Sequence, residues 1–303
     1  MIRLGMLGYN PGNGHPFSFS AIINGYEDTS MRAAGWGVIA DYLAPHEVPA
    51  KLAGIARVTS AWCPTAEMST ALARTCAIDQ VVTEPLDMLG DVDAVIIARD
   101  DWETHLPLSL PFLEQGVPVF VDKPLTLDSG ELSVFLPYLE RGQLASWSGL
   151  RFAPELRSLA PVADTASIRG IGVGTWDRYA VHVLEPSLAL AGEVPLSGEP
   201  LPCDHEAVAF RMPSGGLLQV DVLGDGAQTG FHLETFTADG FDHIEFRDRF
   251  TAFEDGLVAF VEQVQSGKPS VPPQATVTTI RALIAGSRAL RESRRVELSE
   301  VAA

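Results

Sequence analysis

The chain has 303 residues, of which 46% are hydrophobic and 20% charged, which is the composition of a globular protein with one or two domains. Its formal net charge of −18 argues against nucleic acid or an anionic membrane surface as a partner, because both would repel it. No apolar run is long enough to span a bilayer, and the N-terminal stretch MIRLGMLG does not resemble a signal peptide. The three cysteines form no disulfide framework. We therefore expect a reducing, cytoplasmic setting.

The first 125 or so residues alternate strand-like and helix-like runs. Short apolar runs predict buried strands at 2–8, 57–62, 93–98 and 118–122, with helices at 16–26, 66–77 and 102–115. This order implies a parallel sheet that is covered by helices on both faces. Residues 27–56 lie between the first helix and the second strand, and their Gly and Pro content predicts a loop-rich insertion.

A glycine-rich stretch, GYNPGNGH, follows the first expected strand directly. Glycines at this point let the backbone approach a pyrophosphate, and the next helix directs its free N–H groups at the phosphates. The spacing is G-x-x-x-G-x-G rather than G-x-G-x-x-G, and a plain strand-to-helix turn explains it almost as well. The strand and helix context favours a nucleotide site, with the candidate residues Gly8, Asn10, Gly12, Asn13, Gly14 and His15.

The end of the second expected strand lacks the acid that usually binds the adenosine ribose. It reads Ala61, Trp62, Cys63 and Pro64, and the nearest cation is Arg57 at the start of the strand. Trp62 is a candidate for stacking on an adenine, with core packing as the alternative, and Cys63 lies beside it. NAD and NADP therefore both remain open as cofactors.

The second half of the chain reads as a succession of strands. They are expected at 166–176, 205–212, 216–223, 230–238 and 243–246, with a helix from about Arg178 among them. Several strands alternate apolar and polar residues, which predicts an antiparallel sheet with one open face. Two helices, at 252–265 and 275–291, close the chain.

The stretch VFVDKPLTLD places Asp122, Lys123 and Pro124 where a buried strand stops. Ligands of open parallel sheets sit beyond the carboxyl ends of the strands, and Pro124 keeps Lys123 out of helical geometry. A lysine held there can hydrogen-bond a substrate hydroxyl and help its proton leave. Taken alone, D-K-P fits a surface turn better.

The run from DAVIIARDD to LTLD, residues 93–128, resembles the Gfo/Idh/MocA oxidoreductase family. That family has an apolar strand, a loop that leads to a histidine, a helix that ends in Gly, another strand, and then E-K-P or D-K-P. His105 and Asp122-Lys123-Pro124 fall on these marks, and residues 260–298 look like the closing helices of the family. The resemblance implies a Rossmann-like α/β domain at 1–124, with the insertion at 27–56, and a domain at 125–303 for substrate binding and oligomerisation. The second domain would be α+β, with an open, mainly antiparallel sheet.

The family also has a helix with a histidine, usually with Asp four residues before it and Asp three residues after it. The stretch DRYAVHVLEP matches, with His182 as the histidine, Glu185 as the later acid and Arg178 in place of the earlier one. Tyr179-Ala180-Val181-His182 is similar to a branch with Tyr-Gly-Ile-His. The resemblance implies that His182 is the acid–base residue, with Tyr179 as a second candidate, and positions 178, 182 and 185 would share one helical face.

The resemblance implies NAD- or NADP-dependent oxidation or reduction at a hydroxyl or keto carbon of a sugar, cyclitol or related polyol. His182 would exchange the hydroxyl proton, and Lys123 would polarise the oxygen. Further cofactor contacts are expected from Arg99, Asp100, His105, Asp122 and Lys123, and substrate contacts from Lys123, Arg151, Arg178, His182 and Glu185.

Two other functions remain open. The first is a non-redox enzyme that retains its nicotinamide, as glycosidases with this fold do, and the second is a binding or regulatory protein without a cofactor. We expect no metal, because Asp204, His205 and Glu206 open an alternating strand and cannot all face one ion. An open sheet invites pairing, so a homodimer or homotetramer is expected.

Overall fold

The computed structural model describes residues 1–157, 159, 165–238 and 240–302. The chain forms two compact units, and we refer to them as unit 1 and unit 2. Unit 1 comprises Met1–Asp122, Pro137–Ser146 and Phe253–Ser270, and unit 2 comprises Lys123–Leu136, Trp147–Ala252 and Val271–Ala303. The expected division into domains at residue 124 falls beside the end of the first segment of unit 1, and that division stays a prediction.

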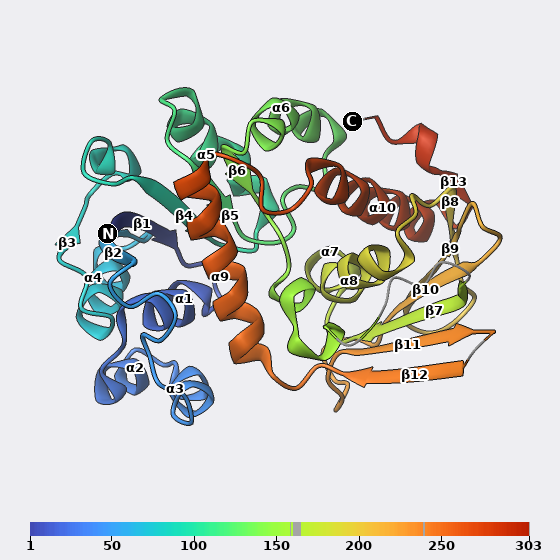
Figure 1. The fold of residues 1–303 in the computed structure, drawn as a ribbon, viewed down its shortest axis with the longest axis horizontal. Helices are drawn as coiled ribbons and strands as arrows, with labels where there is room; N and C mark the ends of the chain where they lie inside the picture. The colour runs from blue at the N-terminus through green and yellow to red at the C-terminus, as the bar shows by residue number, and fades with distance from the viewer. Residues whose placement is uncertain (158, 160–164, 239, 303) are drawn as a thin grey trace. The chain divides into compact units, whose positions relative to one another are not determined.

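Unit 1 contains a six-stranded sheet in the order β3-β2-β1-β4-β5-β6 (Figure 1). All of its neighbouring strands are parallel, as the alternation of strands and helices predicts. Every residue of β4 and of β5 is buried, which explains why their sequences are continuous apolar runs. The strands are β1 (Ile2–Gly8), β2 (Ala56–Trp62), β3 (Gln80–Val81), β4 (Ala94–Ala98), β5 (Val119–Val121) and β6 (Leu144–Ala145).

The insertion at 27–56 has no helix or strand over residues 34–36 and 44–55, in line with the loops expected from its composition. It contains two short helices, α2 (Asp28–Ala33) and α3 (Gly37–Leu43). The Glu27 side chain caps α2 by accepting hydrogen bonds from two backbone N–H groups. Met31, Ile39 and Leu43 are buried, so apolar packing stabilises helices that the Gly and Pro content alone does not suggest. The other helices that begin in unit 1 are α1 (His15–Asn24), α4 (Ala66–Thr75), η1 (Pro85–Met88), η2 (Trp102–Thr104) and α5 (His105–Glu114).

The helix α9 (Arg249–Ser266) belongs to unit 1 from Phe253 onward, although it comes late in the chain. The Gln263 side chain amide donates to the carbonyl oxygens of Gly142 at 3.0 Å and Leu144 at 3.1 Å. The rings of Phe260 and Phe120 pack with their centroids 5.6 Å apart. The helix therefore fixes the last strand of the parallel sheet through partners that lie far away in sequence.

Unit 2 contains a seven-stranded sheet in the order β12-β11-β7-β10-β9-β8-β13. Its neighbours are antiparallel except for the parallel pair β7 and β10, so the expected mainly antiparallel sheet is confirmed. Helices α8 and α10 pack against its strands, Trp176 of α7 stacks on Phe210 of β9, and Figure 1 shows the three helices over one face of the sheet. The strands are β7 (Thr165–Gly172), β8 (Ser197–Pro200), β9 (Glu206–Arg211), β10 (Leu217–Val222), β11 (His232–Thr237), β12 (Gly240–Glu245) and β13 (Val296–Glu297).

The helix expected from about Arg178 is two consecutive helices, α7 (Trp176–Tyr179) and α8 (Val181–Ala191), with Ala180 between them. Arg178 and His182 therefore belong to different helices. The remaining helices are α6 (Ser129–Glu140), η3 (Gly149–Phe152), η4 (Pro154–Leu156), α10 (Pro273–Glu292) and η5 (Leu298–Glu300).

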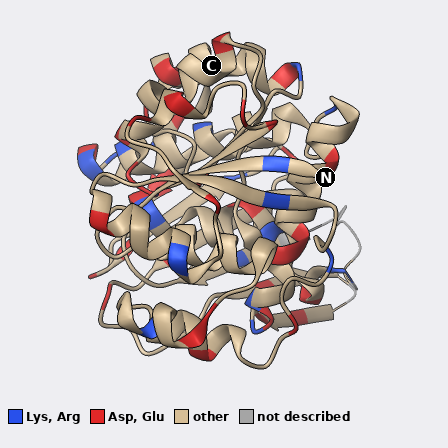
Figure 2. Cartoon of the chain, turned by 90° about the vertical axis from the view of Figure 1, so that its left-hand side faces the viewer, with Lys and Arg blue, Asp and Glu red and all other residues tan. Residues whose placement is uncertain are grey.

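The charges of the chain are dispersed rather than gathered. Figure 2 shows acidic residues on many helices and loops in this view, with basic residues between them. Within the described ranges, no helix combines the length and apolar character that crossing a membrane requires.

Candidate active site

The helices α7 and α8 lie close to strand β7 because glycines replace side chains beneath them. A Cβ atom at Gly170 would lie 2.9 Å from the Cβ of Val183 on α8. A Cβ atom at Gly174, where φ is +78°, would lie 2.2 Å from the Tyr179 ring. Both contacts would be too short for any larger residue, so these glycines set the positions of Tyr179 and of the helix that carries His182.

The His182 side chain is buried inside unit 2, with 7% of the residue exposed. Its Nδ1 atom lies 2.8 Å from the hydroxyl oxygen of Ser148. The imidazole ring also packs near Phe231 at 5.0 Å and Tyr179 at 6.0 Å between centroids. A hydrogen bond at one nitrogen and aromatic rings beside it restrict the orientation of the histidine.

Glu185 lies one helical turn after His182 and is also buried. Its Oε2 atom accepts a hydrogen bond of 2.7 Å from the backbone N–H of Ser148, and its Oε1 atom lies 3.4 Å from the Arg151 guanidinium. Burial raises the pKa of the Glu185 carboxyl to about 7, although the Arg151 charge acts in the opposite direction. Arg151 and Glu185 line a pocket of about 290 Å³ that opens to solvent, which places an ionisable carboxyl beside a pocket of unit 2.

Lys123 follows β5 and begins unit 2, and only 3% of the residue is exposed. Its Nζ atom lies 5.5 Å from the centre of the Tyr179 ring, and the Arg178 guanidinium lies 5.7 Å from the same centre. Tyr179 therefore contacts Lys123, Arg178 and His182. The structure brings these predicted residues together in unit 2, although Lys123 and His182 are far apart in sequence.

The glycine-rich loop in unit 1 joins β1 to α1, as predicted. A Cβ atom at Gly8 would lie 2.5 Å from the Pro16 ring, and one at Gly14 would lie 2.5 Å from Ile39. These two glycines allow close packing of α1 on β1 and of the insertion on the loop. Gly12 has φ +84°, and a Cβ atom there would meet no heavy atom within 4 Å, so its backbone borders open space.

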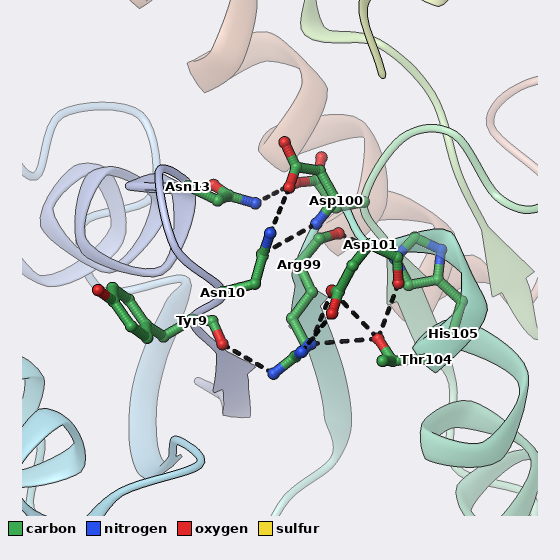
Figure 3. A network of polar contacts seen from close by, with 9 residues as sticks. Tyr9, Asn10, Asn13, Arg99, Asp100, Asp101, Thr104 and His105 are labelled. Carbon is green, nitrogen blue, oxygen red and sulfur yellow. Dashed lines mark hydrogen bonds and ion pairs between the residues drawn. The ribbon is translucent and has the colours of Figure 1, made fainter. Parts of the chain in front are cut away.

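Polar side chains of this loop bind carboxylates that follow strands β4 and β5. The Asn10 side chain donates to Asp100 at 2.7 Å and accepts from the Asp100 backbone N–H at 3.3 Å (Figure 3). Asn13 donates to Asp122 at 3.4 Å, and His15 Nδ1 lies 2.6 Å from the same Asp122 oxygen. The loop is thus tied to the carboxyl ends of two strands, where the sequence places the cofactor site.

Arg99 and His105 hold the segment that follows β4. Arg99 pairs with the Asp101 carboxylate, and its guanidinium also donates to the Tyr9 carbonyl at 2.7 Å and the Thr104 hydroxyl at 3.1 Å (Figure 3). The His105 ring is fully buried, with Nε2 2.9 Å from the Arg99 carbonyl oxygen. Both side chains thus stabilise this segment, and their expected roles as cofactor contacts stay predictions.

Trp62 and Cys63 lie at the carboxyl end of β2. The indole N–H of Trp62 donates to the Thr83 carbonyl at 3.1 Å. The Cys63 thiol is buried, and this burial raises its pKa to about 12. Arg57 is engaged with Asp79 and with the Ala77 carbonyl. The expected contacts of Trp62 and Cys63 with a cofactor stay predictions.

Two of the three consecutive residues weighed as metal ligands, His205 and Glu206, have separate partners. His205 Nε2 lies 2.9 Å from Asp221, and Glu206 accepts a 2.6 Å hydrogen bond from the backbone of Trp176. Ser148, in contrast, was not among the sequence candidates, although it contacts both His182 and Glu185. No local sequence signal marks it, because a serine before a short 3₁₀ helix is a common cap.

A parallel sheet in the order 3-2-1-4-5-6 with a glycine loop after its first strand defines unit 1 as Rossmann-like. Residues 34–148 match the family model GFO_IDH_MocA, which describes an oxidoreductase family with an NAD-binding Rossmann fold. The resemblance to the Gfo/Idh/MocA family is thereby confirmed over this segment.

Comparison with individual proteins gives the same relationship. Over 85 residues the chain is 41% identical to inositol 2-dehydrogenase 4 of Saccharopolyspora erythraea, a match that covers 26% of this chain and 25% of that protein. A probable dehydrogenase from Thermotoga maritima superposes with a TM-score of 0.74 at 15% identity, covering 99% and 100% of the two chains. Scyllo-inositol dehydrogenase from Lactobacillus casei, solved with NAD(H) and scyllo-inositol, gives 0.74 at 14% identity and 99% coverage of both chains. At sequence identities of 14–15%, these superpositions show that the fold is shared, and nothing more.

Proposed function

We propose that the protein is an NAD- or NADP-dependent oxidoreductase that acts on a hydroxyl or keto carbon of a sugar, cyclitol or related polyol. The observation that supports it most is the assembly of Lys123, Tyr179 and His182 in unit 2. A buried lysine and a buried histidine provide the two groups that hydroxyl oxidation needs, one to polarise the oxygen and one to take its proton. The partial match to an inositol dehydrogenase supports a cyclitol as the first substrate class to test.

The residues of unit 1 fit a dinucleotide at the loop between β1 and α1. The backbone at Gly12 borders open space, and α1 begins directly after the loop, so its first N–H groups are oriented as in phosphate sites. Gly12, Gly14 and the first turn of α1 would hold the pyrophosphate. When bound, the nicotinamide supplies the hydride acceptor or donor.

Residues of unit 2 transfer the proton of the substrate hydroxyl. In the oxidation direction, the substrate hydroxyl loses its proton to His182, while the ammonium group of Lys123 hydrogen-bonds the same oxygen and stabilises its developing negative charge. The hydrogen on the carbon leaves as a hydride, and the carbon–oxygen single bond becomes a carbonyl. In reduction, His182 returns the proton to the oxygen.

Replacement of Lys123 tests this function. Lys123→Met is expected to lower the turnover of inositols or sugars on the order of 10²- to 10⁴-fold, while nucleotide affinity stays within a few-fold. Lys268→Met is the matched control, because Lys268 is exposed in unit 1. Absorbance of the reduced nicotinamide measures turnover, and a Lys123→Met enzyme with near-normal turnover would contradict the assignment.

A binding protein without a cofactor is the second candidate. Two buried carboxylates, Asp100 and Asp122, favour it. They form polar contacts with side chains of the glycine loop and its first helical turn. Negative charge at this point disfavours a pyrophosphate. Calorimetric titration with NAD⁺, NADH, NADP⁺ and NADPH separates the two functions, since no binding up to millimolar nucleotide would support the second.

We further propose that the protein is a cytoplasmic homodimer or homotetramer. Phe236 and Phe241 are exposed on the strands β11 and β12, with their ring centroids 4.9 Å apart, and such apolar patches favour association. Cys63, Cys76 and Cys203 are free thiols, which suits a reducing compartment.

A further inference from the structure

We propose that the pocket lined by Arg151 and Glu185 is a second small-molecule site of unit 2, which binds a small organic carboxylate through the Arg151 guanidinium. Its volume of about 290 Å³ is close to the lower end of the range of about 300–1,000 Å³ that is usual for ligand sites. The walls come from η3, from α8 and the residues after it, and from α10. The proposal goes beyond the proposed function, because the ligand is not the polyol.

Arg151 has hydrogen-bonding capacity that its protein partner does not use. Its side chain is 17% exposed and meets Glu185 Oε1 through a single nitrogen, Nη1, at 3.4 Å. Among the described residues, no other oxygen accepts a hydrogen bond from this guanidinium. A guanidinium has five N–H donors in a fork that matches a carboxylate, and a largely buried donor without an acceptor is unfavourable. A carboxylate ligand in the pocket would supply the acceptors.

Uncharged groups complete the walls of the pocket. Gln274 and Thr278 line it from the first turns of α10. The helix α10 is 20 residues long and begins without a side-chain cap and without an acid in its first turn, so its partial positive charge adds to the charge of Arg151. Leu188 and Val194 provide apolar contact. Together these groups suit an anion that has a short hydrocarbon chain.

The acids of the pocket limit the charge of the ligand. Glu193 also lines the pocket, and its Oε2 atom accepts the backbone N–H of Ser214 at 3.2 Å. A phosphate dianion or a dicarboxylate would bring a second negative charge toward Glu185 and Glu193, and Coulomb repulsion disfavours this. A monocarboxylate therefore fits the pocket better than either.

Glu185 competes with such a ligand for Arg151. Burial raises the pKa of its carboxyl to about 7, and Arg151 is the charged group that acts in the opposite direction, together with the Ser148 N–H. Glu193 is the other acid of the pocket, α10 contributes uncharged side chains, and His182 lies one turn earlier on α8. When a carboxylate occupies the guanidinium, Glu185 takes up a proton, because a buried carboxylate without a counter-charge is costly. The affinity should therefore fall as the pH rises through 7.

Titration with butyrate at constant ionic strength, followed by ligand-observed NMR, tests the site. The wild type should bind butyrate on the order of millimolar, and about 10-fold more tightly at pH 6 than at pH 8. Butanol has the same chain without the charge, and inorganic phosphate has charge without the chain. Both should bind at least about 10-fold more weakly than butyrate.

Three variants locate the binding. Arg151→Gln should weaken it at least about 10-fold, with Arg291→Gln, at an exposed arginine in the last turn of α10, as the matched control. Because Arg151→Gln also leaves Glu185 without its partner, Ala189→Phe is a second test. Ala189 is an exposed residue of α8 that lines the pocket, so the larger side chain should block the pocket without changing the core. Glu185→Gln should bind butyrate equally at pH 6 and pH 8.

These measurements do not use turnover, so their outcome is independent of the proposed function. A wild type that does not bind butyrate would overturn the site, and so would binding that Ala189→Phe leaves unchanged. Displacement of butyrate by an inositol would assign the pocket to the substrate site and overturn the second site. An affinity of the wild type that is equal at pH 6 and pH 8 would overturn the competition between Glu185 and the ligand.

Discussion

His182 is held by Ser148 at one nitrogen and packs beside Tyr179 and Phe231, so its replacement by Ala should leave a folded protein that cannot exchange the substrate proton. We expect His182→Ala to lower kcat by about 10²- to 10⁴-fold with nucleotide binding retained. Oxidation by the wild type should decline at low pH, because only the neutral imidazole accepts a proton, and the variant should lack this limb. His243→Ala, at an exposed histidine on β12, is the control. An unchanged limb in His182→Ala would assign it to another group.

Glu185 is one such group, because burial raises its pKa to about 7 from the ordinary value of 4.5. A carboxyl whose pKa is raised on folding stabilises the fold fully below its unfolded pKa, and this contribution is lost as the pH rises through the folded pKa. The loss between pH 4.5 and 7 is on the order of 3 kcal/mol at most. Glu185→Gln cannot ionise, so its free energy of unfolding should fall less than that of the wild type between pH 5 and pH 8. Urea denaturation at the two pH values measures the difference, and an equal fall in both proteins would contradict it.

At the scale of single residues, the sequence identifies groups that a local motif marks. Lys123 and His182 were recognisable as candidates because D-K-P and the stretch DRYAVHVLEP resemble two motifs of the Gfo/Idh/MocA family. Ser148 was not, because its significance comes from a hydroxyl that meets a ring on a distant helix. The expectation that Arg178 would share a helical face with His182 stays a prediction: Ala180, between α7 and α8, has the helical angles φ −56° and ψ −33°, and the Arg178 guanidinium lies 5.7 Å from the centre of the Tyr179 ring.

Among the elements, α9 illustrates how a helix late in the chain stabilises the first sheet. Gln263→Leu should remove hydrogen bonds to two carbonyl oxygens and one from the Ser270 N–H, and leave the buried carbonyls of Gly142 and Leu144 without these partners. Each lost partner costs about 1–3 kcal/mol, so we expect the free energy of unfolding to fall by roughly 2–5 kcal/mol. Glu262→Leu, at the exposed neighbouring position, should change it by less than about 0.5 kcal/mol. Urea denaturation of both variants makes the comparison, and equal stabilities would show that Gln263 does not anchor α9.

Elements with a strong local pattern were predictable, and elements that depend on distant partners were not. β4 and β5 are apolar at every position because helices cover both faces of their sheet. The short strands β8 and β13, in contrast, form only by pairing with each other and with β9, and no sequence period marks them. The placement of α9 in unit 1 could not be predicted for the same reason, since its partners Gly142 and Leu144 are remote in sequence.

For the molecule as a whole, composition gave the net charge of −18 but not the division of the chain into units. Unit 1 is built from three separate segments and unit 2 from three others. A single boundary along the sequence describes such an arrangement incompletely, because the chain leaves each unit and returns to it. The net charge of −18 implies mutual repulsion between copies, so any association must rely on an apolar patch and should strengthen with salt.

The strongest candidate for that patch is the pair Phe236 and Phe241, which are 41% and 55% exposed. If copies of the chain associate through this part of the sheet, a two-fold axis places every substitution in the interface twice. Phe236→Glu combined with Phe241→Glu would then remove apolar contact and bury unpaired charges, each of which strongly opposes association. Size-exclusion chromatography with light scattering should show a dimer or tetramer for the wild type and a monomer for the double variant, with unchanged circular dichroism.

Val38→Glu, at a 72% exposed position on α3, should leave the assembly intact. A double variant with the wild-type mass would place the interface elsewhere, and a monomeric wild type would exclude the proposed assembly.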